Sequence, residues 1–424
     1  MRWLVRSGLA RALLVAALGF APQVAGAQDA PTEAPMPGAD LTVSLVTIGS
    51  GAKVFERFGH NLLWVRSSAT PVDSVWDWGR FSFDTERFFI RFAQGDLRYW
   101  MKGDSAELYI PWYMSMGRTV SSQELALTPA QRLQLLEFLR WNDTDEHRFY
   151  QYHYYNDNCS TRIRDALDAV LGGAIRARTD TLVTPWSYRD QTKRLNQHNP
   201  LLYFSLTTLL AGTTDRKITA WEEMFLPSGL ARYVRDVQVP GPDGAMTPLV
   251  VREETLATGG LYPVPDAPAR WWPGFLLVGV LLGAALAATG RTRHRLLGRA
   301  FLPLAALYLL IAGVLGLTMA LLWSVSGHEV AWRNENLWQF NLASLALLAI
   351  LPRARRGDER LTAAAWLLAL AIVGCSLFGV ALKVFPVFDQ ANWDVIALAL
   401  PANIGVALGV VGARSEKREG RREK

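Results

Sequence analysis

Cys159 is the residue whose type and position in this sequence most favour chemistry. It lies at the start of a predicted helix, in the string YNDNCSTRIRDALDAVLGG, and the chain has one other cysteine, Cys375. A helix N-terminus offers unpaired N–H groups and the positive end of the helix dipole, and both favour a thiolate. The same N–H groups can stabilise the oxyanion of an attacked carbonyl. We therefore expect Cys159 to act as a nucleophile.

A thiolate nucleophile normally works with a histidine base, and His60 is the candidate that we favour. It follows Gly59 and begins the apolar string HNLLWV, so a strand would hold its imidazole on a rigid element. His153 is the alternative because it is closer to Cys159 in sequence, but its tyrosine neighbours favour packing. A structural, hydrogen-bonded histidine remains the alternative for each of them.

Polar side chains on both sides of the thiol are expected to support the helix. Asn158 or Asp157 would cap it, because either side chain can accept hydrogen bonds from the first turn. Arg162 and Arg164 add positive charge, and Asp165 is expected to pair with one of them.

The patterns around these residues predict an external α+β domain over residues 41–265. Alternating strings with glycine-rich turns predict strands, and apolar residues at helical spacing predict amphipathic helices. The predicted strands cover 41–51, 58–68 and 74–84, the predicted helices 128–143 and 159–171, and a short aromatic helix and a strand share 86–103. A domain of about 220 residues is large enough to bury a core.

The N-terminus has the pattern of a secretion signal. Arg2 and Arg6 precede a short apolar stretch, and the A-x-A string at 25–27 predicts cleavage before Gln28. An uncleaved anchor is the alternative. Residues 1–27 are thus the predicted signal peptide, and the Pro- and Ala-rich residues 28–40 a flexible N-terminal segment.

Residues 266–413 predict a membrane domain of about five helical spans. Most of its apolar runs approach or exceed the roughly 17–25 residues that cross a bilayer. The runs cover 271–289, 300–324, 337–351, 361–384 and 394–412, and the third is the shortest.

The basic residues of the chain predict the orientation of these spans. Residues 291–299, 352–360 and the tail 414–424 are rich in Arg and Lys, whereas the alternate loops are poor in them. With five spans and an external N-terminal domain, every basic segment lies on the cytoplasmic side, as the positive-inside rule requires. The net charge of +6 is thus a topology signal, which argues against nucleic-acid binding.

Cys375 lies in the fourth apolar run, so we do not expect it to form a disulfide with Cys159 in the external domain. We expect neither a metal site nor a cofactor, because the sequence has no H-E-x-x-H string and no Cys/His cluster at ligand spacing.

Five strings of the external domain resemble those of one known family. In order along the chain they are GHNLLWV, WDWGRFSFD, FAQGDLRYW, YNDNCSTRIRDAL and MFLPSGL. Together they resemble the external domain of the Lnb-type lipoprotein N-acyltransferases. The string HEVAWRNENLWQFN at 328–341 resembles the membrane part of that family, so the resemblance covers nearly the whole mature chain.

The resemblance implies a circularly permuted papain-like fold, as in NlpC-type peptidases and lecithin:retinol acyltransferase. In such folds the histidine strand precedes the cysteine helix, as His60 precedes Cys159. Carried over by position, Cys159 is the nucleophile and His60 the base. Asp77 in VWDWG is the candidate that orients His60, and Asn158 is expected to orient groups around the oxyanion.

The resemblance also implies candidate substrate contacts. Arg189, with Asp215 as its possible partner, would bind a lipid phosphate or form a structural ion pair. His328, Asn334 and Asn336 lie in a loop on the side of the thiol, where they would bind lipid head groups, dock the external domain or stabilise the loop. A set of aromatic residues would line an acyl groove or pack in the core: Phe88, Phe89, Phe92, Tyr99 and Trp100.

Three functions remain open from the sequence. The first is a bacterial inner-membrane acyltransferase that moves an acyl chain from a membrane phospholipid, through a Cys159 thioester, to the N-terminal amine of a lipoprotein. The second is a membrane-tethered papain-like hydrolase acting on cell wall or phospholipid. The third is a non-catalytic envelope scaffold, which the presence of both Cys159 and His60 disfavours.

Overall fold

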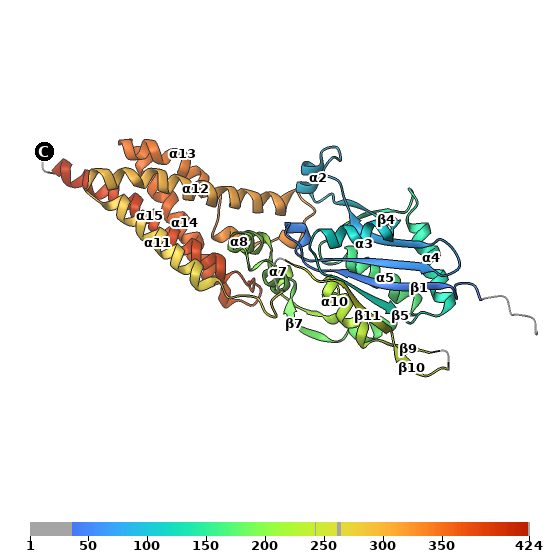
Figure 1. Cartoon of the computed structure of the whole chain (residues 1–424). Coiled ribbons are helices and arrows are strands. Elements are labelled where there is room, and N and C mark those ends of the chain that lie inside the picture. The colour runs from blue at the N-terminus through green and yellow to red at the C-terminus, as the bar shows by residue number, and fades with distance from the viewer. Residues whose placement is uncertain (1–35, 242, 261–263, 423–424) are drawn as a thin grey trace, which may run out of the picture.

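The computed structural model describes residues 36–241, 243–260 and 264–422. The predicted signal peptide, residues 1–27, lies outside the described residues. Two parts are visible in Figure 1: a domain built around a sheet, and a bundle of long helices that extends away from it.

The first part contains a seven-stranded antiparallel sheet with the strand order β11-β5-β1-β2-β3-β4-β6. Its strands are β1 (Leu41–Ile48), β2 (His60–Ser67), β3 (Asp73–Arg80), β4 (Arg98–Ser105), β5 (Val120–Leu125), β6 (Phe149–Gln151) and β11 (Val250–Ala257). The order confirms the predicted α+β class and places the strand that begins at His60 next to the strand that carries Asp77.

Helices cover both faces of this sheet, because the apolar side chains along each strand point alternately to one face and to the other. On one face, Val43, Leu45 and Leu63 pack with buried residues of α4 (Pro129–Asn142) and α5 (Cys159–Val170). On the other face, Val46 and Leu62 pack against α3 (Ala106–Ser115). The sheet is thus buried between two helical layers, as the period-2 pattern requires.

Smaller elements connect the sheet to the bundle. They include α2 (Phe88–Gln94), α6 (Ala174–Thr179), β7 (Val183–Ser187), α7 (Tyr188–Asn196), α8 (Pro200–Leu209), β8 (Lys217–Thr219), α9 (Ala220–Glu223), α10 (Pro227–Tyr233), and the hairpin of β9 (Gln238–Pro240) and β10 (Met246–Pro248). Residues 152–158 form a turn, in which the His153 ring accepts hydrogen bonds from the N–H groups of Tyr155 and Asn156.

The second part has five helices that are long and apolar enough to cross a membrane, as predicted. They are built on α11 (Trp272–Arg291), α12 (Arg295–Ser324), α13 (Ala343–Arg356), α14 (Glu359–Ala381) and α15 (Trp393–Arg422). Helix α13 begins later than the predicted run at 337, because residues 335–338 form a short 3-10 helix, η5, with polar contacts to the sheet domain.

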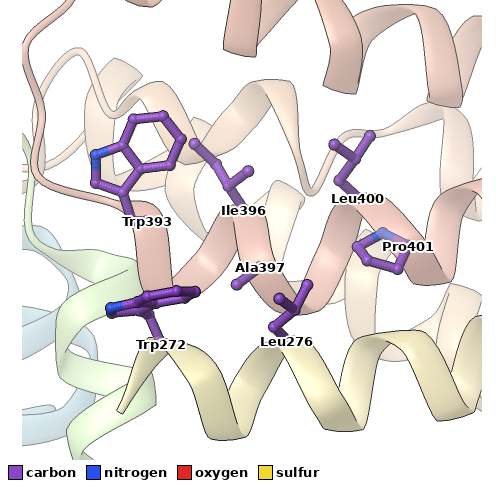
Figure 2. A pocket seen from close by; sticks show the side chains of 7 residues that line it. All are labelled: Trp272, Leu276, Trp393, Ile396, Ala397, Leu400 and Pro401. Atoms are coloured by element: carbon purple, nitrogen blue, oxygen red, sulfur yellow. The ribbon is translucent and has the colours of Figure 1, made fainter. Parts of the chain in front are cut away.

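Helices α11 and α15 lie side by side, and an apolar cleft of about 450 Å³ opens where both begin. Figure 2 shows Trp272 and Leu276 of α11 facing Trp393 and Leu400 of α15 across it. Both indoles lie at the end of the bundle that faces the sheet domain (Figure 1).

The element order agrees with the permuted arrangement, since the strand of His60 precedes the helix of Cys159. The papain-like fold itself stays a prediction.

Candidate active site

Cys159 is the first residue of α5, and the local sequence determines that position. The side chain of Asn158 accepts hydrogen bonds from the N–H groups of Ser160 (2.9 Å) and Thr161 (3.0 Å), while Thr161 Oγ1 accepts from the N–H of Asn158 (2.7 Å). This reciprocal cap ends the preceding turn and starts the helix. The first N–H groups of a helix have no acceptor within it, so the N–H of Cys159 is a candidate donor to an oxyanion formed beside the thiol.

His60 and Asp77 meet across two neighbouring strands. His60 Nε2 donates to Asp77 Oδ2 at 2.7 Å, and the Asp77 side chain is buried. Arg80 Nε donates to the other carboxylate oxygen of Asp77 at 2.6 Å. The sheet therefore holds His60 with its Nε2 bonded to a carboxylate. This is the arrangement that orients a catalytic imidazole.

The same histidine interacts with the thiol. Burial lowers the pKa of His60, but the negative charge of a Cys159 thiolate, the hydrogen bonds to Asp77 and Cys159, and the Asp77 charge raise it, to about 9 in all. Because Nε2 donates to Asp77, Nδ1 is the nitrogen left to face the sulfur. At neutral pH the raised pKa favours the imidazolium form of His60, which places a proton donor next to the candidate nucleophile.

Gly79 allows β3 to approach the start of α5. Its φ is +92°, and a Cβ at this position would lie 3.4 Å from Cys159 Cβ and 3.8 Å from Tyr152 Cε2. Tyr152 stacks on Tyr99 with a centroid distance of 4.4 Å. Burial raises the pKa of Tyr152 well above its usual value, so its phenol stays neutral beside the thiol.

Comparison with known families agrees with this geometry. Residues 28–194 match the family model described as the Lnb N-terminal periplasmic domain, and this range contains Cys159, His60 and Asp77. We call the part of the chain that contains this match the Lnb domain. The match confirms the resemblance indicated by the sequence strings, and with the five apolar helices it makes the chain a membrane protein with a periplasmic domain. No curated protein and no solved structure matched the chain.

The Asn158 side chain is engaged within the protein, and its role around the oxyanion stays a prediction. Its Nδ2 group donates to the carbonyl oxygens of Tyr154 (2.9 Å) and Phe225 (3.0 Å), and the residue is buried. Both amide hydrogens thus have backbone acceptors, so Asn158 positions the cysteine helix.

Arg189 is likewise engaged inside the protein. It is 1 % exposed and pairs with Asp215, and its guanidinium also donates to the carbonyl oxygens of Thr207, Leu210 and Ala211. These contacts leave no open face for a lipid phosphate. The geometry supports the structural alternative, in which Arg189 holds the end of α8.

The loop residues His328, Asn334 and Asn336 join the Lnb domain to the bundle. His328 Nε2 donates to the carbonyl oxygen of Phe92 at 2.6 Å. Asn334 Nδ2 and Asn336 Nδ2 each donate to the carbonyl oxygen of Thr208 at 2.9 Å, and all three loop residues are buried. Their contacts are those of docking, one of the alternatives left open by the sequence.

His153 is not placed as the base. Its Nδ1 accepts hydrogen bonds from two backbone N–H groups of its own turn, and burial lowers its pKa. Asp165 pairs with Arg164, as the sequence suggests, and Arg162 pairs with Asp157.

Sequence reasoning missed several residues of this site, notably Arg80, Tyr113 and Tyr152. The Tyr113 ring lies 6.0 Å from that of His60. A partial signal was present for Arg80, which follows Asp77 by three residues across a register shift in β3. Among the described residues, no group of three His, Cys, Asp or Glu side chains is placed to hold a metal ion.

Proposed function

We propose that this protein is a cysteine-dependent N-acyltransferase that moves an acyl chain from a membrane phospholipid to the N-terminal amine of a lipoprotein. The observation that carries the proposal is the row Cys159–His60–Asp77 in an Lnb domain attached to five apolar helices. Both substrates are anchored in the bilayer, so an enzyme acting on them gains from being held at its surface. The proposed location is the bacterial inner membrane, with the C-terminus in the cytoplasm.

In the first half-reaction, the Cys159 thiolate attacks the carbonyl carbon of a phospholipid ester. The N–H of Cys159 stabilises the oxyanion. The carbon–oxygen bond then breaks, and the His60 imidazolium gives its proton to the departing alkoxide. The products are an acyl thioester on Cys159 and a neutral lysophospholipid alcohol.

In the second half-reaction, the lipoprotein amine attacks the thioester carbonyl. His60, now neutral, takes a proton from the amine, and the carbon–sulfur bond breaks to release the thiolate. An amide has formed, and the imidazolium–thiolate pair is restored. Asp77 keeps the imidazole oriented throughout and stabilises its charged form.

The test is to express the full chain in cells that lack lipoprotein N-acylation and to measure the mass of a lipoprotein N-terminal peptide. We expect a third acyl chain with the wild-type chain and none with Cys159→Ala or His60→Ala. Arg235→Ala, a change far from the thiol on an exposed ion pair, is the control that retains activity.

The hydrolase alternative uses the same thiol and histidine, with water in place of the amine. Release of free fatty acid or cleaved cell-wall fragments without lipoprotein acylation would contradict the transferase. Full acylation by Cys159→Ala, with protein levels matched, would exclude a cysteine nucleophile altogether.

A further inference from the structure

Helix α2 presents apolar side chains outward. None of its seven residues is buried, and the exposed fraction is 74 % for Phe89, 50 % for Ile90 and 40 % for Phe92. A helix this short is not stable alone in water. Large exposed apolar patches normally mark a surface that binds another apolar body.

Two further phenylalanines extend this surface. The exposed ring of Phe83 lies 6.3 Å from that of Phe89 and 6.4 Å from that of Phe55, which is also exposed. We call Phe55, Phe83, Phe89, Ile90 and Phe92 the aromatic patch. Because its members come from three separate segments, the patch is a product of the fold and not only of one apolar string.

The patch is attached directly to the end of a candidate membrane span. Helix α12 ends at Ser324, and the N–H of Gly327 donates to the carbonyl oxygen of Gln94 at 2.7 Å. The ring of His328 also bonds to α2, because its Nε2 donates to the carbonyl oxygen of Phe92. The backbones are so close that a Cβ on Gly95 would lie 2.8 Å from Gly327. Helix α2 therefore lies against the end of α12 that faces the sheet domain (Figure 1).

Exposed indoles lie at the helix ends on this side of the bundle. Trp323 lies at the end of α12, and Trp272 and Trp393 lie at the start of α11 and α15, all about half exposed (Figure 2 shows the last two). Tryptophan prefers the boundary between head groups and acyl chains. The aromatic patch is therefore joined to the end of a span that carries an exposed indole, Trp323.

We propose that the aromatic patch inserts into the head group–acyl boundary of the leaflet on the side of the Lnb domain. The occupant of this surface is lipid, because the patch continues a surface already defined by the spans and their indoles. The cavity between α2 and Phe81 is only about 20 Å³, too small for an acyl chain. The lipid contact is therefore on the outer surface of the patch.

Insertion of the aromatic patch would also place the Cys159 thiol relative to the membrane. This step rests on the proposed function. Ring contacts lead from Phe88 to Phe81 (6.0 Å), from Phe81 to Tyr99 (5.1 Å) and from Tyr99 to Tyr152, beside Cys159. An inserted patch would hold this row of rings, and the thiol at its end, above the level of the phospholipid esters.

The test is photo-crosslinking in the full chain, reconstituted in vesicles of phosphatidylethanolamine and phosphatidylglycerol. p-Benzoylphenylalanine replaces Phe89 in one variant, Ile90 in a second and Met246 in the control. Met246 is 60 % exposed on β10, in a hairpin that points away from the bundle (Figure 1). Phospholipid adducts are then measured by mass spectrometry.

We expect roughly tenfold more phospholipid adduct at positions 89 and 90 than at 246, since an interfacial helix buries its apolar face about 5–10 Å into the boundary. Equal adduct at all three positions, or a crosslinked dimer in place of the lipid adduct, would overturn the proposal. The readout needs no turnover at Cys159, so its outcome is independent of the proposed function.

Discussion

His60 lies between a thiol and a carboxylate, and these two neighbours determine its charge. Burial alone would favour the neutral imidazole. The thiolate of Cys159 and the carboxylate of Asp77 outweigh burial and raise the His60 pKa from 6.5 to about 9. The protonated form is thus favoured below about pH 9 and lost as the pH rises through that value. This proton is the one that the departing alcohol needs.

Asp77→Asn is therefore expected to move the alkaline limit of thioester formation to lower pH. In the wild type the rate should fall as the pH rises through about 9, because the imidazolium loses its proton. Without the Asp77 charge the rate should begin to fall at a lower pH. The maximal rate should also drop by about 10²–10⁴-fold, as when a triad carboxylate is neutralised. The measurement is the pH profile of single-turnover acylation of Cys159.

Asp104→Asn is the matched control, since Asp104 is the other carboxylate that pairs with Arg80. Its profile should stay close to the wild type. If the profiles of Asp77→Asn and the wild type superimpose, Asp77 does not influence the catalytic histidine.

The site depends on two elements approaching closely, β3 and the start of α5. Strand β3 pairs regularly with β4 up to Asp77, and a register shift follows between Asp77 and Arg80. Gly79, in that irregular stretch, has a positive φ and lies against Cys159. The bend thus serves two purposes: it brings Arg80 back to Asp77, and it leaves room for the thiol.

We expect Gly79→Ala to lower the rate of Cys159 acylation by roughly tenfold or more, because even partial misplacement of reacting groups is costly. The new methyl group would lie 3.4 Å from Cys159 Cβ and would have to share that space with substrate. Cys159 labelling by an acyl donor and the unfolding temperature should be measured together.

Gly173→Ala provides the comparison. Gly173 has a similar φ of +87°, but nothing lies within 4 Å of a Cβ built there. Both variants should lose about 1–2 kcal/mol from the left-handed backbone, and only Gly79→Ala should lose activity. Equal activity loss in both would point to strain, not crowding, as the cause.

At the scale of the whole molecule, the sheet domain is held on the bundle by buried polar contacts. Asn334 and Asn336 bind the carbonyl oxygens at the end of α8, and Asn392 Nδ2 donates to Asn336 Oδ1 at 2.8 Å. On another side, Lys193 pairs with Asp394 of α15 at 2.7 Å. Such contacts fix the position of the candidate active site relative to the bundle.

Asn336→Ala should loosen this docking by about 1–3 kcal/mol, because it removes one of the two hydrogen bonds to the Thr208 carbonyl oxygen and takes the Asn336 acceptor from the buried Asn392 Nδ2. Amide hydrogen exchange of residues 207–211 should become faster. Acyl transfer from bilayer phospholipid should fall, while reaction of Cys159 with a small water-soluble thiol reagent should not change.

Gln238→Ala, at an exposed position in β9, should leave all three measurements unchanged. Slower thiol labelling in Asn336→Ala would show that the substitution disturbs the active site itself, and so would contradict a role limited to docking.

The sequence alone predicts the features that depend on local pattern. Helical spacing after Asn158 predicts the helix that begins at Cys159, and run length predicts five apolar helices, both of which the structure confirms. Apolar alternation predicts the strand of His60. These patterns are readable because periodicity and capping act over only a few residues.

Only the tertiary structure decided which polar side chains meet. The sequence left open whether Asp77 faces His60, because that depends on strand register and on the irregular end of β3. It also left open whether Arg189 binds a lipid phosphate or forms a structural ion pair, whereas in the fold its guanidinium donates to Asp215 and to backbone carbonyl oxygens. A buried donor takes whichever acceptor the packing brings near, and no local pattern specifies that partner.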